Sequence, residues 1–225
     1  MRRFRVERIA ERITLDAAGS HHLLRVVGIA PGETVEVFDT AGAVARAQLV
    51  GVEEGAAVLA VIERVAASAL PQRWLLVGVV RPAAMEIVLR MGTELGLDHL
   101  WPVWTERTVR RASERRERWV RIAESAAEQC GRATVPTIAS PRPLAEALAD
   151  VPCADRFVAL PGVSGRAVPP AGDAAIVVGP EGGLTPREVE GAEALGFRAV
   201  TLGPHTLRTE TAAIAALAWL ARGDS

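Results

Sequence analysis

A glycine-rich stretch late in the chain has the residue types of a ligand-binding loop. Residues 177–188 are VVGPEGGLTPRE, so an apolar run leads into glycines and then into residues that start a helix. Loops in this position commonly bind phosphate. The glycines at 179, 182 and 183 do not have dinucleotide-binding spacing, and a Walker A loop needs a lysine, which this sequence lacks. The two common phosphate-binding loops are therefore excluded.

Glu181 also argues against phosphate, because a carboxylate in the turn repels it. The loop's backbone amides and carbonyls instead suit a ligand with amide, ribose or adenine edges. The alternative is that the glycines only supply left-handed turn geometry. After the loop, Thr185, Pro186 and Glu188 form a capping-box sequence, which predicts that a helix begins at Thr185.

A second polar stretch, LGPHTLRTETAA at residues 202–213, follows the next predicted strand. Thr209 or Thr211 can be read simply as a helix cap, and Arg208 with Glu210 as an exposed ion pair. Two polar loops at adjacent strand ends are more than caps require. We therefore place the candidate site at these two loops.

Composition narrows the chemistry further. All 26 basic residues among the 225 are arginine, which excludes a Schiff-base lysine and a lysine general base. Cys130 and Cys153 form no CxxC pair and are expected to be free, buried thiols. The four histidines are scattered, so we expect no metal site. No apolar run approaches a membrane span and no signal peptide is evident, so we expect a cytoplasmic protein without a membrane partner.

Charge is segregated along the chain although the net charge is only −1. Residues 71–138 carry 11 Arg against 8 acids, a local +3, whereas residues 139–225 carry 7 Arg against 10 acids, a local −3. Residues 106–121, ERTVRRASERRERWVR, contain seven arginines and three glutamates. Such a helix is either a solvated face or a phosphate-contacting surface, and composition does not choose between them.

The first third of the chain predicts a small β-barrel. One short helix is expected at Ser20–Val27 with Ser20 as its N-cap. The expected strands are Phe4–Ile9, Ile13–Leu15, Thr34–Phe38, Val44–Val50 and Ala57–Val65.

Residues 66–71 break this pattern, so we expect a first domain at 1–68 and a second at 72–225. In the second, apolar runs alternate with helical patterns, which predicts a mostly parallel α/β sheet whose ligands lie at the carboxyl ends of its strands. The expected strands are Trp74–Val80, His99–Val103, Arg156–Leu160, Ala174–Val178 and Ala199–Leu202. The expected helices are Met85–Leu95, Ser113–Cys130, Pro143–Asp150, Thr185–Leu195 and Thr209–Arg222.

The two polar stretches together resemble a known family. VGPEGGLTPREVE followed by LGPHTLRTETAAIAAL is similar to the 16S rRNA (uracil-N3)-methyltransferase family (RsmE type) of the SPOUT superfamily. The resemblance extends to TELGLDHLWPVWTERTV at 93–109, IAESAAEQCGR at 122–132 and PGETVEVF at 31–38, with His22 before it. It therefore covers both expected domains.

The resemblance implies a PUA-like RNA-binding barrel, a C-terminal domain with a trefoil knot, and a homodimer. It also implies S-adenosylmethionine as cofactor and methylation of N3 of one uridine in the 16S rRNA of the small ribosomal subunit. The implied cofactor-binding residues are Leu160, Pro161, Gly179, Pro180, Glu181, Gly182, Leu202, Gly203, Leu207, Arg208 and Thr209. The expected RNA contacts are His22, Arg107, Arg110, Arg111, Arg115, Arg116 and Arg118.

The chemistry of uracil N3 selects Arg208 and Glu181 as the expected catalytic residues. N3 carries an imide proton and is a poor nucleophile until that proton leaves, so the site must stabilise an anion or supply a base. Arg208 suits contact with the developing anion or with a target phosphate, but guanidinium stays protonated and is no base. Glu181 and Glu210 are the available carboxylates, and either can also serve only loop or dimer geometry.

Two positions depart from the family pattern. Val26-Val27-Gly28 occupies the place of a Val-Leu-Arg turn, and Arg90 that of a common lysine. Two alternatives remain open: a SPOUT methyltransferase acting on another RNA, and a non-catalytic RNA-binding or ribosome-assembly factor. A nucleotide-dependent oxidoreductase fits worst, because no dinucleotide fingerprint follows a predicted strand.

Overall fold

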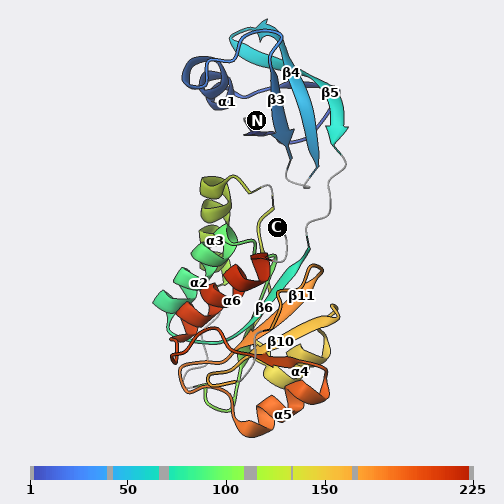
Figure 1. Ribbon diagram of the computed structural model, residues 1–225. Coiled ribbons are helices and arrows are strands. Elements are labelled where there is room, and N and C mark those ends of the chain that lie inside the picture. Colours follow the sequence, from blue (N-terminus) through green and yellow to red (C-terminus); the bar gives the residue numbers. More distant parts are fainter. Residues whose placement is uncertain are drawn as a thin grey trace. The chain divides into compact units, whose positions relative to one another are not determined.

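The chain divides into two compact units, residues 1–69 and 70–225. The structure is a computed structural model, and it describes residues 3–39, 43–65, 71–108, 116–132, 134–163 and 167–222 (Figure 1). Among the described residues, no helix has the length and apolar character needed to cross a membrane.

The first unit is a small β structure that fits a PUA-like barrel. Its sheet has the order β1-β3-β4-β5-β2; the pairs are antiparallel except β1 with β3. A tight turn at Glu54 and Gly55, both with positive φ, joins β4 to β5. The strands are β1 Arg3–Arg5, β2 Arg12–Thr14, β3 Thr34–Phe38, β4 Val44–Glu53 and β5 Ala56–Val65.

The helix of the first unit begins earlier than the sequence predicts. α1 spans Ala17–His21 and continues as the π-helical η1 over His22–Val26. Its N-cap is Asp16, whose side chain accepts a hydrogen bond from the Gly19 amide at 2.6 Å. The prediction of Ser20 as the cap is therefore wrong: Ser20 is buried, and its hydroxyl accepts from the Ala57 amide at 2.9 Å.

Gly28 follows this helix with a φ of 72°. A residue with a side chain is strained in that conformation, whereas glycine adopts it freely. The backbone therefore gives a physical reason for glycine where the family pattern has arginine.

The second unit is built on a parallel sheet, as the sequence predicts. Its order is β12-β10-β11-β6-β7-β8, with β9 also paired to β7, and all of these pairs are parallel. The strands are β6 Arg73–Gly78, β7 His99–Trp104, β8 Thr137–Ile138, β9 Arg142–Pro143, β10 Asp155–Ala159, β11 Ala174–Val178 and β12 Arg198–Val200.

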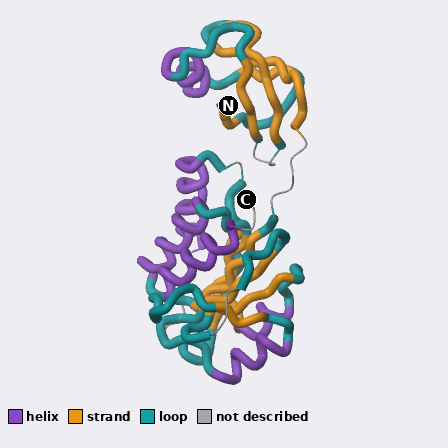
Figure 2. The backbone as a smooth tube through the Cα atoms, in the orientation of Figure 1, coloured by secondary structure: helices purple, strands orange, loops and turns teal. Residues whose placement is uncertain are grey.

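Helices cover both faces of this sheet (Figure 2). Along β6, Leu75 and Val77 pack with α2, α3 and α6, whereas Trp74 and Leu76 pack on the other face with α4 and α5. A strand buried on both faces is an apolar run, which is why residues 74–80 predict one without alternation. The helices are α2 Pro82–Glu94, α3 Arg116–Cys130, α4 Leu144–Ala149, α5 Pro186–Ala194 and α6 Thr209–Ala221.

Both cysteines are free, as predicted, but only Cys153 is buried, whereas Cys130 is exposed at the end of α3. Burial raises the pKa of the Cys153 thiol to about 11. Cys153 therefore remains a protonated thiol at neutral pH.

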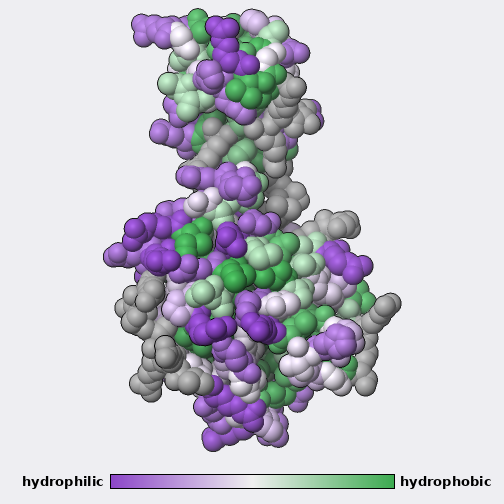
Figure 3. Space-filling model, turned by 90° about the vertical axis from the view of Figure 1, so that its left-hand side faces the viewer, coloured by the Kyte–Doolittle hydropathy of each residue, from purple (hydrophilic) through white to green (hydrophobic). Residues whose placement is uncertain are grey.

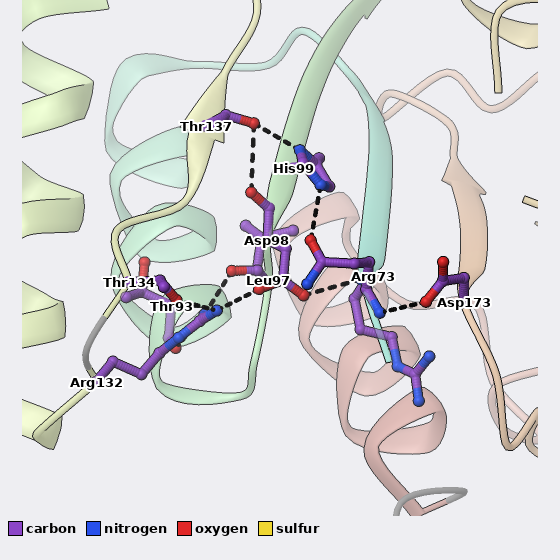
Figure 4. Close-up of polar contacts among 10 residues, drawn as sticks. Arg73, Thr93, Leu97, Asp98, His99, Arg132, Thr134, Thr137 and Asp173 are labelled. Carbon is purple, nitrogen blue, oxygen red and sulfur yellow. Dashed lines mark hydrogen bonds and ion pairs between the residues drawn. The ribbon is translucent and has the colours of Figure 1, made fainter. Parts of the chain in front are cut away.

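A polar network joins the amino ends of β6, β7 and β8 (Figure 4). Asp98 accepts from the Arg73 amide at 2.9 Å and forms an ion pair with Arg132 at 2.5 Å. The next residue, His99, has one ring nitrogen 2.7 Å from the Thr137 hydroxyl and the other 3.0 Å from the Gln72 side-chain oxygen. Its ring also stacks on Trp74, with centroids 4.4 Å apart. This network fixes the strand ends opposite the candidate site.

Burial lowers the pKa of His99, although the charges of Asp98 and Asp173 oppose the shift. As the pH falls through about 6.5, the unfolded chain takes up a proton at this residue before the folded protein does. The free energy of unfolding of the second unit should therefore decrease below pH 6.5, until the pH reaches the lower folded-state pKa. Replacement of His99 by Gln should flatten this dependence.

All five tryptophans lie in the second unit, so tryptophan fluorescence during urea unfolding at pH 5 to 8 reports on this unit alone. The matched control is His21→Gln, an exposed histidine of the first unit, which should leave the pH dependence unchanged. An unaltered slope in His99→Gln would show that this ring does not cause it.

Candidate functional site

Three loops meet at one edge of the parallel sheet. They follow β10, β11 and β12, which are neighbours in the sheet, so their carboxyl ends lie together. Between these loops lies a cavity of about 340 Å³. It is lined by Arg107, Ala159, Leu160, Pro161, Val178, Gly179, Pro180, Glu181, Gly182, Gly183, Leu184, Thr201, Leu202, Gly203, His205, Thr206, Leu207, Thr209 and Ala212.

The loop after β11 is a tight turn whose three glycines are required for two different reasons. The Gly183 amide donates to the Pro180 carbonyl at 2.8 Å, and Gly183 has a φ of 71°. A side chain at Gly182 would place its Cβ 3.1 Å from that of Arg107, and one at Gly179 would lie 3.2 Å from the Leu184 amide nitrogen. Left-handed geometry therefore explains Gly183, whereas close packing explains the other two.

Gly78, at the end of β6, lies close to the backbone of this loop. A Cβ at this position would lie 2.4 Å from the Pro180 nitrogen. The sequence analysis missed this residue, although a glycine inside an apolar strand is a known signal of close backbone approach.

The predicted capping box at the start of α5 is confirmed. The Thr185 hydroxyl accepts from the Glu188 amide at 3.3 Å, and Glu188 accepts from the Thr185 amide at 2.8 Å. The second carboxylate oxygen of Glu188 accepts from the Glu106 amide, also at 2.8 Å. One glutamate therefore fixes the end of the glycine-rich loop and the loop that follows β7.

Thr209 joins the two polar loops of the sequence. It is buried, and its hydroxyl donates to the Gly179 carbonyl at 3.0 Å. The N-cap of α6 is Arg208, which makes no side-chain capping bond. The interpretation of Thr209 as a helix cap is therefore wrong, and the hydroxyl instead holds the start of α6 against the glycine-rich loop.

The structure gathers most of the predicted cofactor-binding residues around the cavity. Glu181 lies on the cavity wall, with its carboxylate 3.8 Å from Arg81 Nε. Arg208 is exposed and does not line the cavity. The lining set contains Leu160, Pro161, Gly179, Pro180, Glu181, Gly182, Leu202, Gly203, Leu207 and Thr209.

The predicted RNA-binding residues are dispersed. Arg107 lines the cavity, whereas Arg116 and Arg118 lie on α3. Arg116 Nε donates to the Ile138 carbonyl at 3.1 Å. His22 belongs to the first unit, where its ring lies 5.7 Å from that of Phe4. Arg110, Arg111 and Arg115 lie outside the described residues.

Arg118 forms an ion pair with Glu86 of α2 at 2.7 Å, and this hydrogen bond raises the pKa of the guanidinium. Both side chains line an open groove of about 930 Å³ between α2 and α3, together with Arg90, Arg121 and Ile122. These helices belong to the face shown in Figure 3, where hydrophilic and hydrophobic residues lie side by side. The groove is separate in its lining residues from the cavity at the carboxyl edge.

His205 and Thr206 are cavity residues that the sequence analysis quoted within a motif but did not select. Their position in the polar stretch between β12 and α6 could have identified them as candidate site residues. His205 is exposed and lines the cavity, which makes it, with Glu181, one of two possible proton acceptors among the described lining side chains.

Comparison with known proteins identifies the family to which the chain belongs. Residues 68–221 match the family described as "RNA methyltransferase domain". The chain is 34% identical over 222 residues to the ribosomal RNA small subunit methyltransferase E of Synechocystis, covering 93% of this chain and 73% of the relative. The chain belongs to this RNA methyltransferase family. The methyltransferase E of Bacillus subtilis is 30% identical over 232 residues, which cover 94% and 91% of the two chains.

Solved structures of this methyltransferase family share the fold. The methyltransferase E of Neisseria gonorrhoeae, bound to S-adenosyl methionine, matches with a TM-score of 0.69 and 32% identity over 97% of this chain and 95% of that chain. The putative methyltransferase Lpg2936 of Legionella pneumophila, in complex with the same cofactor, matches with a TM-score of 0.66 and 25% identity over 97% and 96%.

Replacement of Gly78 by Ala should destabilise the second unit, because the added methyl group meets the backbone at Pro180. Overpacking of this kind costs about 1–3 kcal/mol. The control is Gly191→Ala in α5, where a Cβ meets nothing within 4 Å and helix propensity favours alanine by about 1 kcal/mol. Urea unfolding followed by tryptophan fluorescence compares the two. Equal stability of Gly78→Ala and the wild-type protein would contradict the close approach of Gly78 to Pro180.

Proposed function

We propose that this protein uses S-adenosylmethionine to methylate N3 of a specific uridine in the 16S rRNA of the small ribosomal subunit. The observation that carries the proposal is the cavity at the sheet edge, whose wall includes residues 179–184 of the first polar stretch and residues 202, 203, 205–207 and 209 of the second. Further support comes from relatives that are named ribosomal RNA small subunit methyltransferase E and from a similar structure that is bound to S-adenosyl methionine.

The cavity fits the cofactor in size and chemistry. Its volume of about 340 Å³ is within the range of small-molecule sites. Leu160, Leu202 and Leu207 offer an apolar surface for the adenine, and the turn at 179–183 offers backbone amides and carbonyls. Glu181 supplies a negative charge that favours a nearby sulfonium. When bound, S-adenosylmethionine supplies an electrophilic methyl group on a positively charged sulfur.

The protein's own contribution is to make N3 of the uridine nucleophilic. The imide proton must leave N3, and Glu181 and His205 are the cavity-lining groups that accept protons. Arg208 cannot accept one, but its permanent positive charge stabilises the developing anion or orients a phosphate of the target nucleotide. Its exposed position, adjacent to Leu207 and Thr209 of the cavity wall, suits contact with RNA that enters from solvent.

The proposed RNA contacts outside the cavity are His22 of the first unit and five arginines, Arg110, Arg111, Arg115, Arg116 and Arg118. Arg116 and Arg118 are exposed at the start of α3. Their hydrogen bonds to Ile138 and Glu86 leave several N–H groups of each guanidinium uncommitted by those bonds. Paired arginines still contribute positive potential when arginines exceed acids, as they do over residues 106–121.

We further propose a homodimer, and α6 carries that proposal. From Ala212 to Ala221 this helix contains only Ala, Ile, Leu and Trp, yet Ala218 is exposed and Ile214 is only half-buried. A helix that is apolar on all sides is normally buried, so a second copy of the chain would cover this face. Sedimentation equilibrium should give twice the 23.9 kDa of one chain. A mass of one chain at micromolar concentration would contradict the dimer.

The activity is tested by incubation of the purified protein with labelled S-adenosylmethionine and small ribosomal subunits that lack the modification. Label should enter 16S rRNA, and reverse transcription should stop at one uridine, because N3 methylation blocks base pairing. Free 16S rRNA and large subunits are the comparison substrates. Cofactor binding without label transfer to any RNA would favour a non-catalytic binding or assembly factor, and a stop in another RNA would change the substrate.

Arg208→Ala should strongly slow methyl transfer. It should retain cofactor binding, because Arg208 does not line the cavity. Loss of one preorganised cation at a developing anion costs about 10²–10³ in rate. Calorimetry with S-adenosylhomocysteine checks binding, and single-turnover label transfer checks the rate. Arg187→Ala, an exposed arginine of α5 that does not line the cavity, is the control. Unchanged turnover in Arg208→Ala would remove Arg208 from the mechanism.

Replacement of Arg115, Arg116 and Arg118 together by Gln should weaken RNA binding and reduce its salt dependence. Each lost phosphate contact lowers the slope of log K against log salt by about 0.7–0.9. Filter binding of 16S rRNA fragments at several salt concentrations measures both effects. Arg187 and Arg222, both exposed in the last part of the chain, provide the control double replacement. The same slope in the triple variant would identify this segment as a solvated face.

A further inference from the structure

Arg107 is anchored in the wall of the cavity. Its Nη1 donates to the Gly182 carbonyl at 2.9 Å and to the Leu184 carbonyl at 3.5 Å. Its Cβ also occupies the space next to Gly182, where an added methyl group would approach it to 3.1 Å. Both ends of the side chain are therefore held against the glycine-rich loop.

The short loop that carries Arg107 is held in place as well. The Glu106 amide donates to Glu188 of the capping box at 2.8 Å, and the Thr105 amide donates to the Thr108 hydroxyl at 2.9 Å. These bonds fix the backbone on both sides of Arg107. A side chain that is ordered before a ligand arrives loses little entropy on binding it.

The charges of the cavity match those of the proposed cofactor. Among the described lining residues, Arg107 is the permanent cation and Glu181 the carboxylate. S-adenosylmethionine carries a sulfonium, an ammonium group and a carboxylate. Glu181 suits one of the cationic groups, so the carboxylate requires the opposite charge.

The geometry of the Arg107 guanidinium leaves donors for that carboxylate. Both carbonyl contacts use Nη1, so they do not involve the N–H groups on Nη2 and Nε. A guanidinium has five N–H donors in a planar fork that matches a carboxylate.

We propose that Arg107 binds the carboxylate of the methionine part of S-adenosylmethionine. This assignment rests on the proposed function, and it moves Arg107 from the RNA-contacting set to the cofactor-binding set. Arg107 then has two roles. Its Nη1 bonds to the carbonyls of the glycine-rich loop, and its remaining N–H groups donate to the carboxylate of the cofactor. An RNA phosphate is the competing anion, and it is less suited because Glu181 on the same cavity wall repels a group that brings no positive charge of its own.

The test compares two ligands that differ only in this carboxylate. Calorimetry measures binding of S-adenosylmethionine and of decarboxylated S-adenosylmethionine, which keeps the adenosine, the sulfonium and the amine. The unchanged protein should prefer the carboxylate-bearing ligand by about tenfold, the lower end of what a hydrogen bond to a charged group contributes. Arg107→Met should bind both ligands with nearly equal affinity, and Arg107→Lys should retain part of the preference.

The control is Arg187→Met, an exposed arginine of α5 outside the cavity lining, which should keep the full preference. Thermal melting verifies that each variant is folded. If Arg107→Met weakens both ligands by the same factor, Arg107 only shapes the loop and the proposal is wrong. If it leaves both affinities intact and weakens RNA binding, the anion is an RNA phosphate. Failure of the unchanged protein to bind either ligand would overturn the proposed function itself, and this inference with it.

Discussion

The site depends on the order of strands in the parallel sheet. β10 lies between β11 and β12, so three loops from separate parts of the chain end at one edge and enclose one cavity. The hydrogen bond from Thr209 to Gly179 then joins two of those loops, and the close approach of Gly78 to Pro180 sets the distance between β6 and the loop after β11. If either contact were lost, the loops would remain adjacent but the cavity wall would lose its shape.

Charge is distributed over this framework in a way that suits a cofactor with both signs of charge. The cavity wall presents Glu181 and Arg107, and Arg107 is held by the carbonyls of the same loop. Arg116 and Arg118 on α3 do not line this cavity and bond to Ile138 and Glu86. The arginine-rich segment therefore divides into Arg107, which lines the cavity, and the arginines of α3, for which RNA contact is proposed.

Features that depend on residues close together in the sequence could be predicted without the structure. The capping box at Thr185 depends on residues three apart, and the parallel sheet depends on apolar runs alternating with helices. Other features depend on distant partners. The hydroxyl of Thr209 bonds a residue 30 positions earlier, and Arg107 bonds one 75 positions later. The two-residue strands β8 and β9 are too short to give a periodic pattern. The cap of α1 could not be chosen from the sequence, because serine and aspartate are both common N-cap residues. The fold decides it, since Ser20 is buried and the Asp16 side chain makes the capping bond.

The cavity at the carboxyl edge is the proposed binding site of the methyl donor. The most direct measurement is a crystal structure of the protein with S-adenosylhomocysteine. We expect the adenosine to lie among Leu160, Gly182 and Leu202. A ligand bound in the groove between α2 and α3, with this cavity empty at saturating concentration, would contradict it.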